Sequence, residues 1–221
     1  MNCKIYLFRH GQTTYNRDKR FTGWDDPKLT KLGIKEAKII AGKLKNKRFD
    51  VAFHTRLIRS KQTLNIVLKG HKECKALVED DRMIERNYGK LNGTTHREFM
   101  RNVGNKLCFL ETHGHLIEEL DSKGKTEVEN FLGEQEFNLI HRGYYVPPPK
   151  GESFAMVEKR VNNFIRDLVK MIKREKINVA ISAHGNSIRL FRKIMEKATI
   201  KDTVSWTIPY DKVFEYNIAV D

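Results

Sequence analysis

The sequence predicts an α/β fold, a three-layer sandwich in which helices flank a mainly parallel central sheet. Two observations predict it. Short apolar runs, typical of buried strands, alternate along the chain with longer segments of helical periodicity. Two of these runs, Lys4–Phe8 and Asn178–Ala183, are each followed within three residues by a histidine and a glycine. Polar residues are expected there, because parallel sheets present their ligand sites at the carboxyl ends of the strands.

The first half of the chain contains two predicted strands and two predicted helices. The strands are expected at Lys4–Phe8 and Val51–His54, and a basic helix is expected at Leu57–Leu68. Another helix is predicted over Thr30–Lys45, with Thr30 as a suitable N-cap. Its apolar residues recur at the spacing of one helix face, at Ile34, Ala37, Ala41 and Leu44.

The second half carries the clearest helix, over residues 154–172. One apolar stripe runs along it, made by Phe154, Val157, Val161, Phe164, Ile165, Leu168 and Ile172. A buried strand is expected at Asn178–Ala183, followed by a helix that reaches Ile194 and by a last strand at Val213–Val220.

The chain is expected to form a single domain over residues 1–221, with an insertion or lid at about 93–150. In that stretch the composition is polar and the periodicity is weak. It ends in three consecutive prolines at 147–149, which exclude a helix and a central strand. We therefore expect it to cover an edge of the sheet rather than to form a second domain.

The composition, 39% hydrophobic and 32% charged, is that of a globular protein and not of a disordered one. The apolar runs have the length of strands, so neither a membrane span nor a secretory signal is expected. Three scattered cysteines (Cys3, Cys74 and Cys108) form no pattern typical of disulfide frameworks or zinc sites. A reducing, cytoplasmic setting is therefore expected.

The formal net charge of +14, from 42 Lys and Arg against 28 Asp and Glu, favours an anionic partner. Phosphorylated metabolites, nucleic acid and an acidic membrane face all meet that description. The lysines are nevertheless spread over every segment, so a solvated lysine-rich surface explains the charge equally well. The charge alone does not choose among these partners.

Three predicted strands end close to residues that can bind phosphate. Arg9 and His10 follow the first strand, Arg59 closely follows the second, and His184 follows the third along the chain. Arginine forks grip phosphate oxygens, and the backbone N–H groups of a helix that begins at Gly185 would add donors. A neutral imidazole beside a phosphoryl group can act as a nucleophile while the cations stabilise the transferring group.

Transfer from a leaving oxygen needs a proton donor, and Glu85 in MIERNYGKLNG is the best candidate. It can serve if its surroundings keep it protonated at working pH. A solvated loop carboxylate paired with Arg82 or Arg86 is the alternative, and the residue types leave both open.

Five segments carry a family resemblance: RHGQTTYNRDKRFTGWDDPKLTKLG (9–33), ERNYGKLNG (85–93), HRGYYVPPP (141–149), AHGNSIR (183–189) and IPYDKVFEYN (208–217). They resemble the histidine phosphatase superfamily and, within it, the 2,3-bisphosphoglycerate-dependent phosphoglycerate mutases. The resemblance covers most of the chain except residues 100–140, and it implies a phosphoglycerate mutase-like fold.

The resemblance implies phosphoryl transfer without a metal. His10 would be the phosphorylated nucleophile and Glu85 the proton donor and acceptor, with Arg9, Arg59 and His184 around the transferred group. The substrate-binding residues implied in the same way are Asn16, Thr22, Gly23, Arg86, Tyr88, Arg142, Gly185 and Asn186. The implied cofactor is 2,3-bisphosphoglycerate as the phosphoryl primer, and arginines take the place of a metal ion.

The sequence departs from the mutase pattern at several positions. Gln12, Tyr15, His96 and His141 stand where mutases tend to carry glutamate, tryptophan, lysine and arginine. The segment that follows the three prolines is also shorter than in bacterial mutases. A shorter lid admits water to a phosphohistidine, so some phosphatase activity is expected.

Two enzyme hypotheses follow. The leading one is a mutase that interconverts 3-phosphoglycerate and 2-phosphoglycerate, which needs a second anion grip from Arg86, Arg142 or Arg97. The alternative is a metal-independent histidine phosphatase that hydrolyses sugar phosphates or other phosphomonoesters. Both take small phosphorylated metabolites as partners.

A binding module for nucleic acid or regulation, built on an inactive fold, is less favoured because every catalytic residue type is present. No membrane partner is expected, and a homodimer is left open. Metal binding by His113 and His115 is a weak hypothesis, since no third ligand has suitable spacing.

Overall fold

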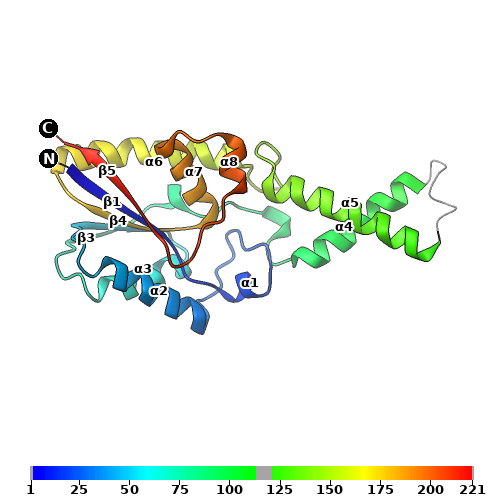
Figure 1. Ribbon diagram of the computed structural model, residues 1–221, viewed down its shortest axis with the longest axis horizontal. Helices are drawn as coiled ribbons and strands as arrows, with labels where there is room; N and C mark the ends of the chain where they lie inside the picture. The colour runs from blue at the N-terminus through cyan, green and yellow to red at the C-terminus, as the bar shows by residue number, and fades with distance from the viewer. Residues whose placement is uncertain (1, 113–120, 221) are drawn as a thin grey trace.

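The computed structural model of the chain describes residues 2–112 and 121–220. Its strands cover Asn2–Arg9 (β1), Val51–His54 (β2), Ala76–Glu79 (β3), Val179–Ala183 (β4) and Val213–Ala219 (β5). They form one five-stranded sheet in the order β3-β2-β4-β1-β5 (Figure 1). The first four strands are parallel, and β5 pairs with β1 in the antiparallel sense.

Helices cover both faces of the sheet, which confirms the predicted three-layer architecture. One face carries α6 (Phe154–Glu175), α7 (Gly185–Glu196) and α8 (Ile200–Ser205), and the other carries α2 (Lys31–Leu44) and α3 (Ile58–Leu68). The short helix α1 (Thr14–Arg17) follows β1, and single turns of 3-10 helix lie at Asp81–Met83 and Gly89–Leu91.

The central strand β1 supplies side chains to both cores, because successive residues of a strand point to opposite faces. Ile5 and Leu7 are fully buried in the core under α6 and α7. Tyr6 and Phe8 are buried in the second core, against α2 and α3. Full burial of each such side chain contributes roughly 1.5–3 kcal/mol, so this alternation fixes the register of β1 between its neighbours.

The predicted strands and helices of the core are found within a few residues of their expected bounds. Thr30 caps α2 as predicted, since its Oγ1 accepts from the N–H of Gly33 at 3.0 Å. The sequence did not predict β3. This strand has four residues at the edge of the sheet, and Leu77 on it is 51% exposed, so it lacks the apolar run of a buried strand.

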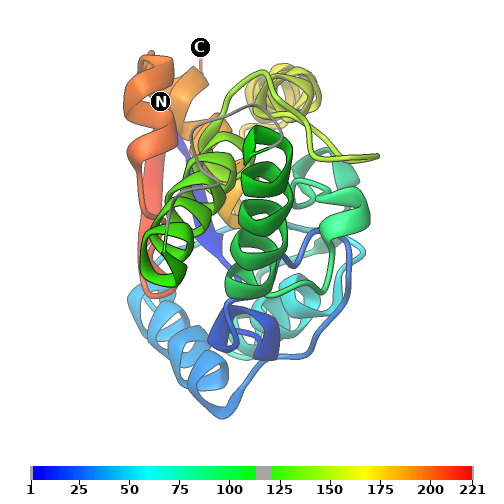
Figure 2. The same cartoon turned by 90° about the vertical axis from the view of Figure 1, so that its right-hand side faces the viewer.

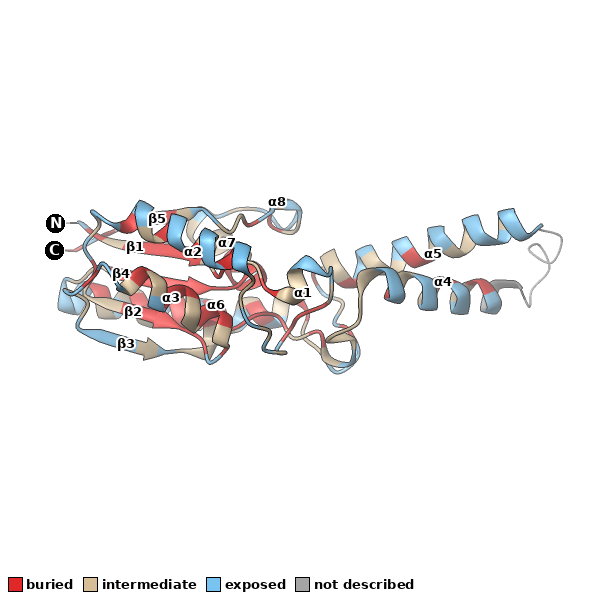
Figure 3. Cartoon of the chain, turned by 90° about the horizontal axis from the view of Figure 1, so that it is seen from below, coloured by how far each residue is buried: buried red, intermediate tan, exposed pale blue. Residues whose placement is uncertain are grey.

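The stretch expected as an insertion or lid contains two long helices, α4 (His96–Thr112) and α5 (Ser122–Arg142). They lie side by side as a hairpin (Figure 2) that projects from the body of the molecule, with largely exposed outer faces (Figure 3). The helices pack closely at Gly104 and Gly133, where an added Cβ would lie 2.0–2.2 Å from a carbonyl oxygen of the other helix. The hairpin was not predicted, and its action as a lid stays a prediction.

Within the two described ranges, no helix combines the length and the apolar character needed to cross a bilayer.

Candidate active site

The strand tips singled out in the sequence meet at one edge of the sheet. Arg9 and Ala183 are register partners on β1 and β4, and the N–H of His10 donates to the Ala183 carbonyl at 3.0 Å. His10 and His184 therefore leave the sheet side by side, with their ring centroids 5.0 Å apart. Arg59 reaches the same place from the first turn of α3.

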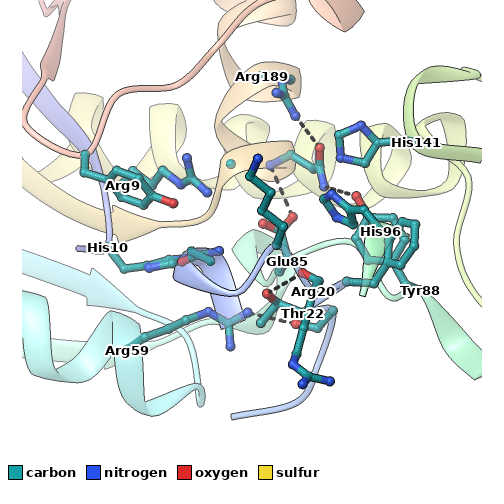
Figure 4. Close-up of a pocket in the computed structure, with 17 residues that line it drawn as sticks. Arg9, His10, Arg20, Thr22, Arg59, Glu85, Tyr88, His96, His141 and Arg189 are labelled. Carbon is teal, nitrogen blue, oxygen red and sulfur yellow. Dashed lines mark hydrogen bonds between the residues drawn. The ribbon is translucent and has the colours of Figure 1, made fainter. Parts of the chain in front are cut away.

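A cavity of about 210 Å³ opens at this edge (Figure 4). Its lining comes from the ends of β1 and β4, the loops around Glu85 and Tyr210, and the base of the α4–α5 hairpin. The lining residues are Arg9, His10, Asn16, Lys19, Arg20, Phe21, Thr22, Gly23, Arg59, Glu85, Tyr88, His96, His141, Gly185, Asn186, Arg189 and Tyr210.

His10 is held in the tautomer that suits a nucleophile. Its Nδ1 lies 2.7 Å from the carbonyl oxygen of Gly11, which can only accept, so Nδ1 carries the proton. The other ring nitrogen, Nε2, is therefore bare in the neutral ring. Burial, and then the charges of Arg59 and Arg9, hold the His10 pKa well below its ordinary value, so the ring is uncharged at neutral pH.

Two arginines flank His10, and main-chain carbonyls fix both of them. Arg9 donates from Nη1 to the Ile208 carbonyl at 2.9 Å, and its guanidinium lies over the Tyr210 ring at 4.1 Å. The fully buried Arg59 donates to the Gly23 and Asp25 carbonyls at 2.8 and 2.7 Å. Burial lowers the Arg59 pKa to about 10, which leaves it charged at neutral pH.

Buried nitrogens without a partner gather around His10. They are the Nε atoms of Arg9 and Arg59 and the Nδ1 of His184. The other ring nitrogen of His184 lies 2.8 Å from the Thr55 hydroxyl. An unpaired buried donor costs about 1–3 kcal/mol. An oxyanion beside His10 would offer an acceptor to the guanidinium groups of Arg9 and Arg59, both of which line the cavity.

Glu85 faces the cavity from a loop that is fixed on its other side. Its Oε1 accepts from the N–H groups of Arg86 at 2.8 Å and Asn186 at 3.2 Å. Its carbonyl accepts from Trp24 Nε1 at 2.9 Å and from Arg160 Nη2 at 3.0 Å. Among the described residues no donor reaches Oε2, which is free to exchange a proton with a ligand. The alternative of a solvated carboxylate is wrong, since Glu85 is only 7% exposed.

The part of the cavity away from His10, here called the distal end, is lined by Arg20, His96, His141 and Arg189 (Figure 4) and by Lys19, whose charge acts on His96. The segment with Lys19 and Arg20 pairs with the start of α4, because the His96 N–H donates to the Lys19 carbonyl at 2.8 Å. Arg189 is held by the Trp206 carbonyl and the Asn186 side chain. The distal end therefore has three cations and no carboxylate among its described residues.

Ten of the thirteen residues predicted for the site line this cavity, and three do not. His184 packs behind His10. Arg86 turns away and donates to the carbonyls of Glu152 at 2.6 Å and Ile140 at 2.8 Å. Arg142 donates to the Val204 carbonyl at 2.8 Å. Neither arginine forms the expected second anion grip.

One further expectation is corrected by the geometry. Arg97 lies in a separate shallow surface groove and does not reach the cavity. Gly11, after His10, packs closely against α2, because an added Cβ would lie 2.1 Å from the Gly33 carbonyl.

Sequence reasoning missed the cations of the distal end. Lys19 and Arg20 lie inside the resembling segment 9–33, and Arg189 is the last residue of the segment 183–189. A lysine or arginine inside one of these segments was the feature of the sequence that could have identified them. Tyr210, whose ring lies under the Arg9 guanidinium, was also missed, and its place in the resembling segment 208–217 could have identified it.

In the described parts of the chain, no group of three or more His, Cys, Asp or Glu residues is placed to hold a metal ion. His113 and His115, proposed as weak metal ligands, lie outside the described residues.

The chain matches a family profile described as the histidine phosphatase superfamily, branch 1, over residues 5–115 and 112–218. It is 31% identical to a 2,3-bisphosphoglycerate-dependent phosphoglycerate mutase from Chlamydia muridarum, over 96% of this chain and 92% of that protein.

Solved structures with the same fold include both mutases and phosphatases. The phosphoglycerate mutase from Bacillus anthracis superposes with a TM-score of 0.68 at 19% identity, over 98% of this chain and 88% of its own. A mycobacterial glucosyl-3-phosphoglycerate phosphatase in complex with VO3 superposes with a TM-score of 0.66 at 20% identity, over 93% and 87%. These likenesses show the fold, which is phosphoglycerate mutase-like as predicted.

Proposed function

This chain belongs to the histidine phosphatase superfamily, and from that premise we propose that it is a 2,3-bisphosphoglycerate-dependent phosphoglycerate mutase. One observation carries the proposal: the cavity has cations at both ends. Arg9 and Arg59 flank His10, while Lys19, Arg20 and Arg189 lie at the distal end. A substrate with two anionic groups, such as 3-phosphoglycerate, matches this distribution of charge.

The proposed reaction begins with a phosphoryl group on His10 Nε2, supplied by 2,3-bisphosphoglycerate. The 2-hydroxyl oxygen of 3-phosphoglycerate attacks the phosphorus, the P–N bond breaks with its electron pair returning to Nε2, and Glu85 takes the hydroxyl proton. The product is 2,3-bisphosphoglycerate with a free His10.

The bisphosphate then turns over in the cavity and presents its 3-phosphate to His10. Nε2 attacks this phosphorus, the P–O bond breaks, and Glu85 returns its proton to the leaving oxygen. 2-Phosphoglycerate leaves and the phosphohistidine is restored, so no proton or phosphoryl group is consumed. Throughout, Arg9 and Arg59 stabilise the charge on the transferring oxygens.

A metal-independent phosphatase is the second candidate, and the composition of the distal end favours it. His96 and His141 are uncharged there because burial and neighbouring cations lower the pKa of both. After the phosphoryl group has passed to His10, a monophosphate product held by fewer fixed cations dissociates sooner, and the phosphohistidine left behind can react with water.

An enolase-coupled assay with and without 2,3-bisphosphoglycerate tests the proposal. We expect isomerisation to depend on the bisphosphate and to exceed the release of inorganic phosphate. The reverse ranking of the two rates would replace the mutase by the phosphatase.

His10→Ala should abolish both turnover and ³²P-labelling of the protein. His54→Ala is the matched control, because His54 also ends a parallel strand and also bonds a neighbouring carbonyl through Nδ1, at 2.9 Å, but does not line the cavity. Labelling should survive in that control. Labelling that persists in His10→Ala would contradict the mechanism.

A further inference from the structure

The distal end contains two imidazoles to which the proposed reaction gives no part. His96 is the first residue of α4 and His141 the last but one of α5, so both stand at the base of the hairpin. Their ring centroids are 5.5 Å apart. Figure 4 shows them on the side of the cavity opposite His10.

Aromatic rings hold both imidazoles but leave their nitrogens free. The ring centroid of His96 lies 4.8 Å from that of Phe21 and 4.9 Å from that of Phe137. His141 stacks on Phe137 and on Tyr88, with ring centroids 4.9 Å and 6.4 Å apart. No hydrogen bond within the described residues involves a ring nitrogen of either histidine. Their nitrogens are therefore available to a ligand in the cavity.

The charged neighbours of the two imidazoles differ. Burial lowers the pKa of His141 to about 3, and the guanidinium groups of Arg142, Arg189 and Arg86 add to this effect, as does the neighbouring His96 ring. For His96 the charged neighbour is Lys19, which adds to burial in lowering the pKa. No described carboxylate contributes to the pKa of either ring, so only an incoming anion can favour their protonation.

We infer that His96 takes up a proton when an anionic group of a phosphorylated ligand enters the distal end, while His141 binds the same group as a neutral hydrogen-bond donor. The inference rests on the proposed function and makes His96 a specificity residue for that reaction. An anion within 4–6 Å raises an imidazole pKa by roughly one to three. His141, starting from about 3, remains neutral near pH 7 after such a change, whereas His96 has one cation to overcome instead of three.

This arrangement selects ligands by the charge of their distal group. A carboxylate or phosphate gains the His96 charge that its own binding creates, while a hydroxyl gains none. Because a proton binds with the anion, affinity falls as the pH rises, by up to about tenfold per pH unit between the pKa of His96 in the free protein and its higher pKa in the complex. A fixed cation at position 96 would not show this dependence.

Calorimetric titration with 3-phosphoglycerate tests the inference, in two buffers of different ionisation enthalpy so that proton uptake is counted. All titrations use the His10→Ala background, which removes turnover and the imidazole nearest the phosphoryl group. We compare this background with versions that also carry His96→Asn, His96→Lys or His141→Asn. The phosphate of the ligand titrates equally in all four proteins and cancels in the comparison.

We expect His96→Asn to bind with roughly 0.5–1 fewer protons than the background near pH 7. His141→Asn should leave proton uptake unchanged although it weakens binding. His96→Lys should bind tightly with little change between pH 6.5 and pH 8. It also serves as the readout if the asparagine variant does not fold.

Equal proton uptake with and without His96 would overturn the inference and leave the mutase proposal intact. If the parent chain shows no isomerisation in the enolase-coupled assay, while the His10→Ala background binds 3-phosphoglycerate with proton uptake by His96, only the mutase proposal is overturned. Failure of every variant and of the background to bind 3-phosphoglycerate would refute both.

Discussion

Replacing Arg86 by methionine separates a structural role for this residue from the substrate-binding role that the resemblance implies. The guanidinium is fully buried and donates to the Glu152 carbonyl at 2.6 Å and the Ile140 carbonyl at 2.8 Å. It thereby ties the loop that carries Glu85 to the end of α5. Methionine retains most of the packing between the Tyr88 and Phe154 rings but none of these hydrogen bonds.

The size of the effect follows from these contacts. Each hydrogen bond from a charged donor contributes about 1.5–3 kcal/mol, and the two carbonyls lose their partner in the variant. Burial lowers the pKa of Arg86, which shows that keeping this cation out of water costs free energy in the parent chain. The methionine variant avoids that cost, and this offsets part of the loss. We therefore expect the free energy of unfolding to fall by about 3 kcal/mol, a large share of the 5–15 kcal/mol typical of a domain.

Urea unfolding followed by circular dichroism measures this change, and steady-state kinetics on the folded fraction measures its effect on the site. Because Glu85 is displaced rather than removed, kcat should fall at least tenfold while KM changes little. Arg174→Met is the matched control. Arg174 lies on α6, its side chain is 77% exposed and it pairs with Glu175, so its loss should cost less than about 0.5 kcal/mol. Unchanged stability with a raised KM in Arg86→Met would refute the structural role and restore substrate binding.

Three more predictions address pH, hairpin packing and proton transfer. The pKa of His141 is about 3 in the folded chain, below its ordinary value of 6.5, so the unfolded chain binds the proton first and stability is lost as the pH falls below 6.5. Between pH 7 and pH 5 His141 should lower the free energy of unfolding by about 2 kcal/mol. Urea unfolding at both pH values should show that this difference is absent from His141→Asn. Gly104→Ala should destabilise the chain, because its Cβ would lie 2.0 Å from the Glu129 carbonyl. Gly42→Ala is the control, at a position on α2 with nothing within 4 Å of the new Cβ, and it should stabilise the chain by about 0.5–1 kcal/mol. Thermal unfolding of both variants measures the two changes. Glu85→Gln keeps the shape of the side chain but cannot exchange the proton, so kcat should fall by roughly 10²–10⁴; a kcat near that of the parent chain would remove Glu85 from the reaction.

The sequence predicted the part of the fold where burial and periodicity agree. Alternating burial along β1 and the apolar stripe of α6 are direct consequences of packing against one sheet, and both are visible as patterns of residue type. The strand β3 was missed because it is short, exposed and held by backbone pairing with β2, which any residue type can supply. The hairpin was missed because its packing surface is only partly apolar: Phe99, Met100 and Val103 of α4 cluster with Phe137 and Ile140 of α5, but the closest approach of the two helices is at Gly104 and Gly133.

The site was predictable to the extent that backbone position determines it. His10 and His184 follow paired strands, so the register of β1 and β4 brings them together whatever the rest of the chain does. The direction of a long side chain is decided by its neighbours instead. Arg86 directly follows Glu85, yet its guanidinium turns to carbonyls at Ile140 and Glu152 that lie far from it in sequence. A resemblance assigns such a residue its place in the chain but not its partners.

Chemistry and ligand selection come from separate elements of this molecule. The groups around His10 are placed by the ends of β1 and β4 and the start of α3, which belong to the buried sheet and its covering helices. Most of the distal end is built by the base of α4 and α5 and by the segment that pairs with it, outside the two main cores; Arg189 on α7 is the exception. A substitution at His96 or His141 can thus change which anion is held without disturbing phosphorylation of His10. Whether the phosphoryl group of a phosphohistidine goes to a hydroxyl or to water is decided by how long the distal end retains the monophosphate that carries the hydroxyl. In this chain the inferred proton uptake by His96 adds to the three fixed cations of the distal end, so the ratio of hydrolysis to isomerisation should rise with pH.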